Sequence, residues 1–317
     1  MTPEVIVQLF VNTLIALFSL IVFFISYRVS KYFHSSATTP LQYRLEKESY
    51  LATTLTKYLF AIKIPLFLFF IFSLEKLATL LPGAMCATGV VNATVYGPYL
   101  LLIKLLNLYL FAYWLVLNSV DLKDVNLPYT PMKFKLLLVF ISLLLVEIVL
   151  ESVMYFSVDM KSIVDCCGVV FSSSDGSYMA WLIGAPFWMQ LTLFLLTFVV
   201  LFIAYVREYY HIYALFSLLF LVVALITLIG VFGTYIYELP THHCPFCMLS
   251  IEYGHIGYLL YTLLFVGTFF GILLTLIDFE VKRKQRYRNI SMLAISSYTL
   301  IVLAYPLLYF IKHGVLL

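Results

Sequence analysis

The residues best suited to chemistry in this chain are its five cysteines. Two of them form the motif Cys244-Pro245-Phe246-Cys247. Thiols at this spacing can close a strained disulfide, as redox-active pairs do, and they can also present two thiolates to one metal ion. His242 and His243 directly precede the motif, where they would favour the thiolate when protonated or serve as ligands when neutral. The motif therefore indicates either thiol redox chemistry or the binding of a soft metal such as copper.

The other three cysteines are Cys86, Cys166 and Cys167. Adjacent cysteines rarely close on each other, so Cys166 and Cys167 would each find a distant partner or share one soft metal. Because the total is odd, at least one thiol is reduced, metal-bound or intermolecular if the others pair. The three are candidates for relay or resolving thiols, and the plainer alternative is that all five cysteines only staple loops.

The elements that must position these residues are membrane helices. The chain is 63% hydrophobic and 11% charged, with a mean hydropathy of +1.03, so lipid must solvate much of its surface. We predict an all-α polytopic integral membrane protein, with one transmembrane helical domain over residues 1–317 and a first span that is retained and not cleaved. The eight predicted spans are 4–27, 58–80, 97–118, 135–157, 186–206, 213–235, 249–278 and 291–311.

The distribution of basic residues predicts the orientation. Of the 19 Lys and Arg residues, 14 fall in one set of loops or at its boundary and 2 in the opposite set, and basic loops stay in the cytoplasm. Both termini should therefore lie on the extracytoplasmic side. We expect the protein in the cytoplasmic (inner) membrane, with the cysteines facing the oxidising side. The basic loops are 28–57, 119–134, 207–212 and 279–290, and the outer loops with all the cysteines are 81–96, 158–185 and 236–248.

Charged residues within spans are costly and are functional candidates. Glu147 and Glu151 stand four residues apart, on one helix face. Lys104, with Asn107 nearly one turn further along, falls near the depth of Glu147 when residues are counted from the span ends. We expect a Lys104–Glu147 pair, which would be part of a proton or cation path or would simply fix helix packing. Lys63 is expected to snorkel to the cytoplasmic interface.

Glu252 and His255 are predicted to lie one turn apart in the seventh span, just below Cys247. Together with Cys247 they would form a proton route or a metal site. The alternative is that both are solvated at the level of the lipid headgroups.

A CxxC at the outer mouth of a helix resembles the quinone-coupled, disulfide-generating membrane proteins of the DsbB and vitamin K epoxide reductase families. The resemblance covers only Cys244 to Cys247 and the start of the seventh span. It implies that these two cysteines pass electrons to a quinone held between helices, and that outer-loop cysteines relay to a partner protein. Those families have a four-helix catalytic core, whereas eight spans are expected here, and this chain has no second CxxC in a loop.

Three functions therefore follow from the sequence. The first is an extracytoplasmic thiol–disulfide oxidoreductase that uses Cys244 and Cys247 and exchanges electrons with a quinone or a periplasmic redox protein. The second is a copper-handling protein that binds metal through Cys244, Cys247, His242 and His243 and exchanges it with a metal carrier. The third is a structural subunit of a membrane complex with loop disulfides. Neither a nucleic-acid partner nor a nucleotide is indicated, because the basic residues lie in loops beside the spans and no Walker A or GxGxxG motif occurs.

Overall fold

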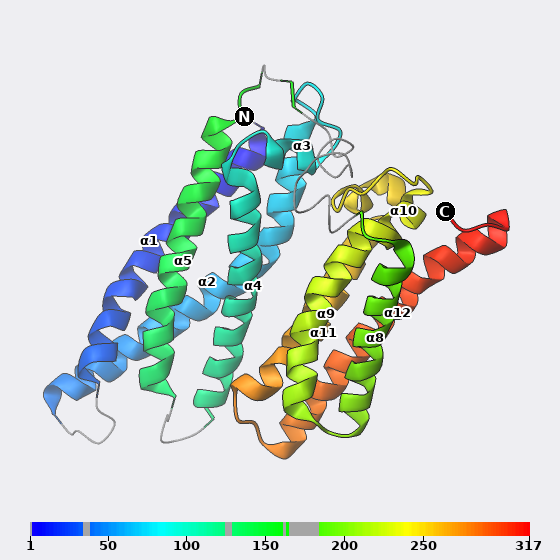
Figure 1. Ribbon diagram of the computed structural model, residues 1–317. Coiled ribbons are helices and arrows are strands. Elements are labelled where there is room, and N and C mark those ends of the chain that lie inside the picture. Colours follow the sequence, from blue (N-terminus) through cyan, green and yellow to red (C-terminus); the bar gives the residue numbers. More distant parts are fainter. Residues whose placement is uncertain (1, 34–38, 124–128, 161–162, 165–183) are drawn as a thin grey trace. The chain divides into compact units, whose positions relative to one another are not determined.

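The computed structural model describes residues 2–33, 39–123, 129–160, 163–164 and 184–317. Within these residues all regular structure is helical and no strand occurs (Figure 1). Eight of the described helical segments are long and apolar enough to cross a bilayer, which confirms the predicted all-α, multi-pass class. The chain divides into two compact units, residues 1–164 and 165–317. That the two units act as one domain stays a prediction.

Unit 1 is a ring of four long helices. They are α1 (Pro3–Tyr32), α2 (Pro40–Ala78), α4 (Tyr96–Asp121) and α5 (Thr130–Ser157), and the short α3 (Ala87–Asn92) joins α2 to α4. Helix α1 packs against α2 and α5, and α4 packs against the same two helices. The ring is therefore closed, and all four helices turn one face toward a common core.

Asp121 fixes the junction between α4 and α5. Its carboxylate accepts hydrogen bonds from the Tyr129 backbone N–H at 2.9 Å, the Thr130 hydroxyl at 2.8 Å and the Lys133 ammonium at 2.7 Å. Asp121 and Lys133 are both buried. One carboxylate at the last residue of α4 thus accepts from an N–H at the start of α5 and neutralises a buried cation.

Unit 2 is a bundle in which successive helices pack against one another. Helix α8 packs on α9, α9 on α11, and α11 on α12. The sixth span is one continuous rod that includes a π-helical turn, in which the backbone bonds reach one residue further than in an α-helix. The bounds are α8 Phe187–Val206, α9 Tyr210–Thr227, the π-helix η1 Leu228–Phe232, α10 Gly233–Tyr237, the 3-10 helices η2 Cys247–Leu249 and η3 Ile251–Tyr253, α11 Ile256–Leu276 and α12 Val281–His313.

Two predicted loops are helical in the structure. Helix α2 begins at Pro40, so much of the predicted loop 28–57 belongs to the helix of the second span. Helix α12 begins at Val281 and includes the basic run of 282–288. Lys, Arg and Glu are good helix formers, so a helix can continue beyond the apolar stretch that hydropathy identifies as the span.

Gly271 allows three helices of unit 2 to approach closely. A Cβ at this position of α11 would lie 2.1 Å from the Ser217 hydroxyl on α9 and 3.1 Å from the Ser291 hydroxyl on α12. The Ser291 hydroxyl in turn donates to the Gly267 carbonyl at 2.6 Å and bonds to the Tyr213 hydroxyl at 2.9 Å. The close approach of the helices at Gly271 therefore allows the Ser291 hydroxyl to bond to both neighbouring helices.

We expect Gly271→Ala to destabilise the protein by about 1–3 kcal/mol, the usual cost of overpacking. A loss of stability would be informative, because Gly→Ala within a helix otherwise raises the free energy of unfolding by about 1 kcal/mol. Unfolding in mixed detergent micelles measures the change. The double variant Gly271→Ala with Ser217→Gly should recover most of the loss, because within the described part of the chain the Ser217 hydroxyl bonds only to the Tyr213 carbonyl of its own helix. A stabilised single variant would contradict the close approach.

Candidate functional site

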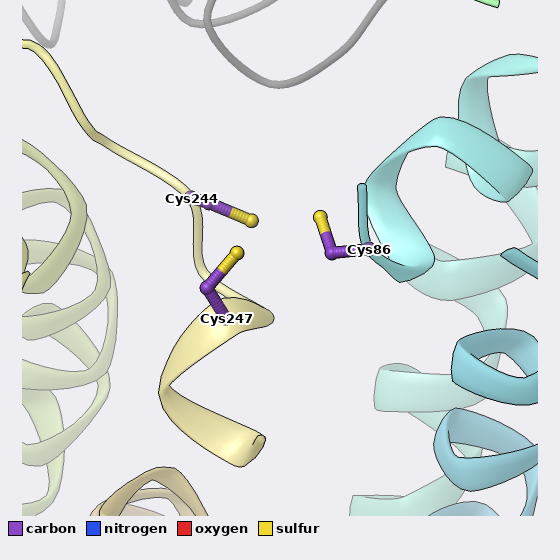
Figure 2. A group of neighbouring side chains, drawn as sticks. All are labelled: Cys86, Cys244 and Cys247. Atoms are coloured by element: carbon purple, nitrogen blue, oxygen red, sulfur yellow. The ribbon is translucent and has the colours of Figure 1, made fainter. Parts of the chain in front are cut away.

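The CxxC segment lies in unit 2, between the end of the sixth span and the start of the seventh. The Sγ atoms of Cys244 and Cys247 lie within 4.8 Å of each other. Figure 2 shows both side chains on the same side of this segment, with their sulfur atoms turned toward each other. Cys244 is buried and Cys247 is partly exposed. The two sulfurs are close enough for small side-chain rotations to join them, since a disulfide needs a separation of about 2 Å.

Two tyrosines hold the backbone of this segment. The Tyr237 hydroxyl donates to the Cys244 carbonyl and accepts from the Met248 N–H at 3.0 Å. The Tyr261 hydroxyl donates to the Pro245 carbonyl at 2.6 Å. Tyr237 ends the sixth span and Tyr261 lies in the seventh, so both spans position the same short loop. The motif is therefore held at three backbone points by side chains from rigid helices.

The histidines near the motif contact the backbone or the edge of a tyrosine ring. His243 Nδ1 bonds to the Ile229 carbonyl at 3.0 Å, within the π-helical turn, and the His242 ring lies edge-on to Tyr237 with centroids 4.5 Å apart. Among the described residues of unit 2, no His ring nitrogen or carboxylate oxygen lies within 4.8 Å of both sulfurs. The structure therefore does not gather His242 and His243 with the two cysteines into a ligand set.

The seventh span begins later than predicted. Helix α11 starts at Ile256, because Gly254 and His255 take left-handed backbone angles, with φ of 63° and 55°. Cys247 instead opens the three-residue helix η2, so the predicted position at the N-terminus of the seventh span is wrong. Glu252 and His255 are exposed and precede α11, and they are not one turn apart within it.

Beside the motif, His255 bonds to the backbone and Tyr253 lies near Cys247 and Glu252. His255 Nδ1 bonds to the Leu249 carbonyl at 2.6 Å. Burial, and next the nearby Cys247 and Glu252, raise the pKa of the Tyr253 phenol, which stays neutral at pH 7. The proton route predicted for Glu252, His255 and Cys247 stays a prediction.

The remaining cysteines are placed only in part. Cys86 lies in unit 1, where it is buried at the N-cap position of α3. Cys166 and Cys167 lie outside the described residues. The relay or resolving roles predicted for all three stay predictions.

A second candidate site lies in the middle of unit 1. The predicted Lys104–Glu147 pair is present, with Lys104 Nζ 2.9 Å from Glu147 Oε1 and 2.8 Å from Glu151 Oε2. Asn107, one turn along α4, donates to Glu147 Oε2 at 2.6 Å. Glu147 and Glu151 thus share one helix face, as their spacing predicted. All four side chains are buried.

Lys63 completes this cluster, and its predicted snorkelling is wrong. Lys63 Nζ lies 2.8 Å from Glu147 Oε1 and 3.0 Å from Asn12 Oδ1, and the residue is 5% exposed. A buried carboxylate and an amide replace the water that snorkelling would have reached. Two lysines and two glutamates therefore meet in the core, which is electrically neutral when all four are ionised.

Helix α1 contributes two amides that the sequence prediction overlooked. Gln8 donates to Glu151 Oε1 at 2.8 Å, and Asn12 accepts from Lys63. The two amides stand four residues apart in an otherwise apolar span, which places them on one helix face. That polar pair was the signal available in the sequence. Every long helix of the ring therefore contributes to one polar network, whose members are Gln8, Asn12, Lys63, Lys104, Asn107, Glu147 and Glu151.

No family model, no curated protein and no solved structure matches this chain. The two sites differ in kind: one is a pair of sulfurs beyond the span ends, and the other is a neutral cluster of charges within the spans.

Gly257 keeps the first turn of α11 against η2, and its replacement should loosen the motif. A Cβ there would lie 2.6 Å from Met248 Cγ and 3.0 Å from the Met248 carbonyl carbon. We expect Gly257→Ala to displace η2 and to speed the alkylation of reduced Cys247 by N-ethylmaleimide about tenfold, as a local opening cheaper by about 1.4 kcal/mol would.

The matched control for this change is Gly254→Asn. No atom of the described residues lies within 4 Å of a Cβ at Gly254, and Asn tolerates its positive φ. The control should leave the alkylation rate unchanged. Equal rates in wild type and Gly257→Ala would show that α11 does not hold the motif.

The charge network should respond to substitution as a coupled unit. Lys104→Met or Glu147→Gln alone leaves one buried charge uncompensated and should cost about 3–5 kcal/mol. The double variant restores neutrality, so its cost should fall below the sum by about 1–3 kcal/mol. Unfolding in mixed detergent micelles supplies all four free energies. Strictly additive losses would show that the two side chains do not interact.

Proposed function

We propose that this chain is a membrane thiol–disulfide exchange protein whose active pair is Cys244 and Cys247. The observation that carries the proposal is the approach of the two sulfurs to within 4.8 Å on a loop held by Tyr237 and Tyr261. A loop fixed at its carbonyls keeps both sulfurs together while they are thiols. This lowers the strain and the loss of conformational entropy that closing the disulfide costs.

The proposed reaction is an exchange with a partner protein. The partly exposed Cys247, as thiolate, attacks one sulfur of a partner's disulfide, and the partner's other sulfur leaves and takes up a proton. Cys244 then displaces the partner from the mixed disulfide. The Cys244–Cys247 pair has lost two electrons and two protons, and the partner has gained them as two thiols. The exchange is reversible: in the opposite direction a partner's dithiol gives two electrons and two protons to the Cys244–Cys247 disulfide and is itself oxidised to a disulfide. A quinone, which the family resemblance implies, would then accept two electrons and two protons from the reduced pair and restore its disulfide.

The proposal places the motif on the extracytoplasmic side. Helix α11 is a candidate span, with the cysteine segment before it and the basic start of α12 after it. Basic residues remain in the cytoplasm, so the end of α11 that adjoins the cysteines would lie outside. Disulfides form and persist on that side in most cells.

Soft-metal handling is the second candidate, because two close sulfurs would also hold Cu(I) if both stayed reduced. The described part of unit 2 offers no imidazole or carboxylate within 4.8 Å of both sulfurs. Redox exchange needs only the pair, whereas a resident metal site generally needs more ligands. The geometry of this unit therefore favours exchange.

The decisive measurement is the reduction potential of the pair in the full-length protein. Purified protein is equilibrated anaerobically with glutathione buffers, and the two thiols are quantified by mass-tagging and peptide mass spectrometry, with metal analysis on the same sample. We expect one two-electron transition at a potential above about −300 mV, in the range of exchange-active disulfides.

Cys244→Ser should abolish the two-electron transition and leave Cys247 able to trap a partner as a mixed disulfide. Cys86→Ser is the matched control and should keep the transition. A midpoint below about −300 mV would identify a structural staple. Reduced thiols with about one bound copper or zinc per chain would instead identify the metal protein.

A further inference from the structure

Within the charge network of unit 1, the two lysines are held unequally. Lys104 contacts two carboxylates, Glu147 and Glu151, and its ammonium also lies 4.2 Å from the centre of the Phe70 ring. An ammonium has three N–H donors, and these three neighbours match them. Lys104 is therefore fully compensated.

Lys63 has fewer partners. Among the described residues, two acceptors lie within hydrogen-bonding distance of Lys63: Asn12 Oδ1 and the Glu147 oxygen that it shares with Lys104. One of its three donors is left over. The charges that face Lys63 come from Lys104 on α4 and from Glu147 and Glu151 on α5, while α1 contributes only the uncharged Asn12.

A small cavity adjoins Lys63. It lies between α2 and α4, and its volume admits about one water molecule. Its apolar walls come from both helices, and its polar lining consists of two lysines and one glutamate. The lining residues are Lys63, Leu66, Phe67, Lys104, Leu108, Phe111 and Glu147. The leftover donor of Lys63 therefore has a place where an oxygen can meet it.

The amide of Asn12 supplies a third observation. Asn12 is only 1% exposed, and its buried Nδ2 has no hydrogen-bond partner among the residues that the structure describes. An unpaired buried donor is costly. If Lys63 loses a proton, its nitrogen gains a lone pair, and rotation of the Asn12 amide presents Nδ2 to that lone pair. The donor that is idle in the charged state is thus the one that the neutral amine needs.

We propose that Lys63 exchanges its proton with water in the adjoining cavity, which makes the Lys63–Glu147 contact a proton-exchange site. In the step, one Nζ–H bond breaks, the proton passes to a water or hydroxide oxygen, and the nitrogen keeps the electron pair. The cluster changes from neutral to a net charge of −1, and it returns to neutral when a proton comes back. Lys104 keeps its protons and holds both carboxylates in place. The step involves no thiol, so it stands or falls independently of the redox proposal.

Hydrogen exchange of the two ammonium groups tests this directly, because an ammonium exchanges only through transient loss of a proton. Full-length protein labelled with [15N]lysine is placed in lipid nanodiscs and transferred to deuterated water, and the Nζ signals are followed by NMR. Lys63→Met and Lys104→Met assign the two signals. If either does not fold, Lys63→Arg or Lys104→Arg gives the same assignment, because arginine keeps the cation and lacks the lysine nitrogen.

We expect Lys63 to exchange about tenfold faster than Lys104, the factor that one additional hydrogen bond confers. Asn12→Asp should slow Lys63 by a similar factor, because a carboxylate accepts from the ammonium and offers the neutral amine no donor. Ser19→Ala is the control: Ser19 is buried about two turns further along α1 and is not a member of the charge network, so the variant should leave Lys63 unchanged. Equal rates for the two lysines, or an Asn12→Asp variant that exchanges as fast as wild type, would overturn the proposal.

Discussion

The constraint on which unit 1 depends is that a charge within a bilayer must be neutralised by protein, because no bulk water is present to do so. Two lysines and two glutamates meet this constraint together, and Glu147 accepts from both lysines through one oxygen. Since every long helix of the ring contributes a polar group, the rotation and depth of each helix are tied to the others. Apolar packing alone would tolerate small slips of a helix, whereas a displaced lysine would lose its carboxylate.

In the described spans of unit 2 the polar contacts come mainly from uncharged groups, and the buried Arg288 is paired with the exposed Glu208. Many of the described polar contacts inside these spans are hydroxyls that bond to backbone carbonyls, as when Ser291 donates to Gly267 at 2.6 Å and Tyr298 to Ala224 at 3.3 Å. Such bonds need close helix approach, which the glycines of α11 allow. The same device extends beyond the spans, where Tyr237 and Tyr261 bond to the backbone of the cysteine loop. The loop is therefore held by the interactions that hold the bundle.

The sequence predicted the number and character of the spans, because a run of about 20 apolar residues has few alternatives to a membrane helix. It also predicted the Lys104–Glu147 pair, since depth can be counted along two helices. Hydropathy could not locate helix ends such as Pro40 and Val281, where charged residues continue the helix into water or headgroups. It could not locate the start of α11 either, because the left-handed residues there are a local backbone choice. The burial of Lys63 depends on its contact with Asn12 of α1, and counting residues along α2 cannot predict a contact with another helix.

The two sites suit ligands of different size. The sulfurs of Cys244 and Cys247 lie beyond the span ends, on a loop with one partly exposed thiol, and a folded protein can reach such a group. Lys63 lies within the spans beside a cavity that admits about one water molecule, so a much larger ligand does not fit beside it. The size of this cavity thus suits the charge network to proton chemistry, while the loop leaves thiol chemistry open to macromolecules. Within each unit, the structure limits what can react by controlling access.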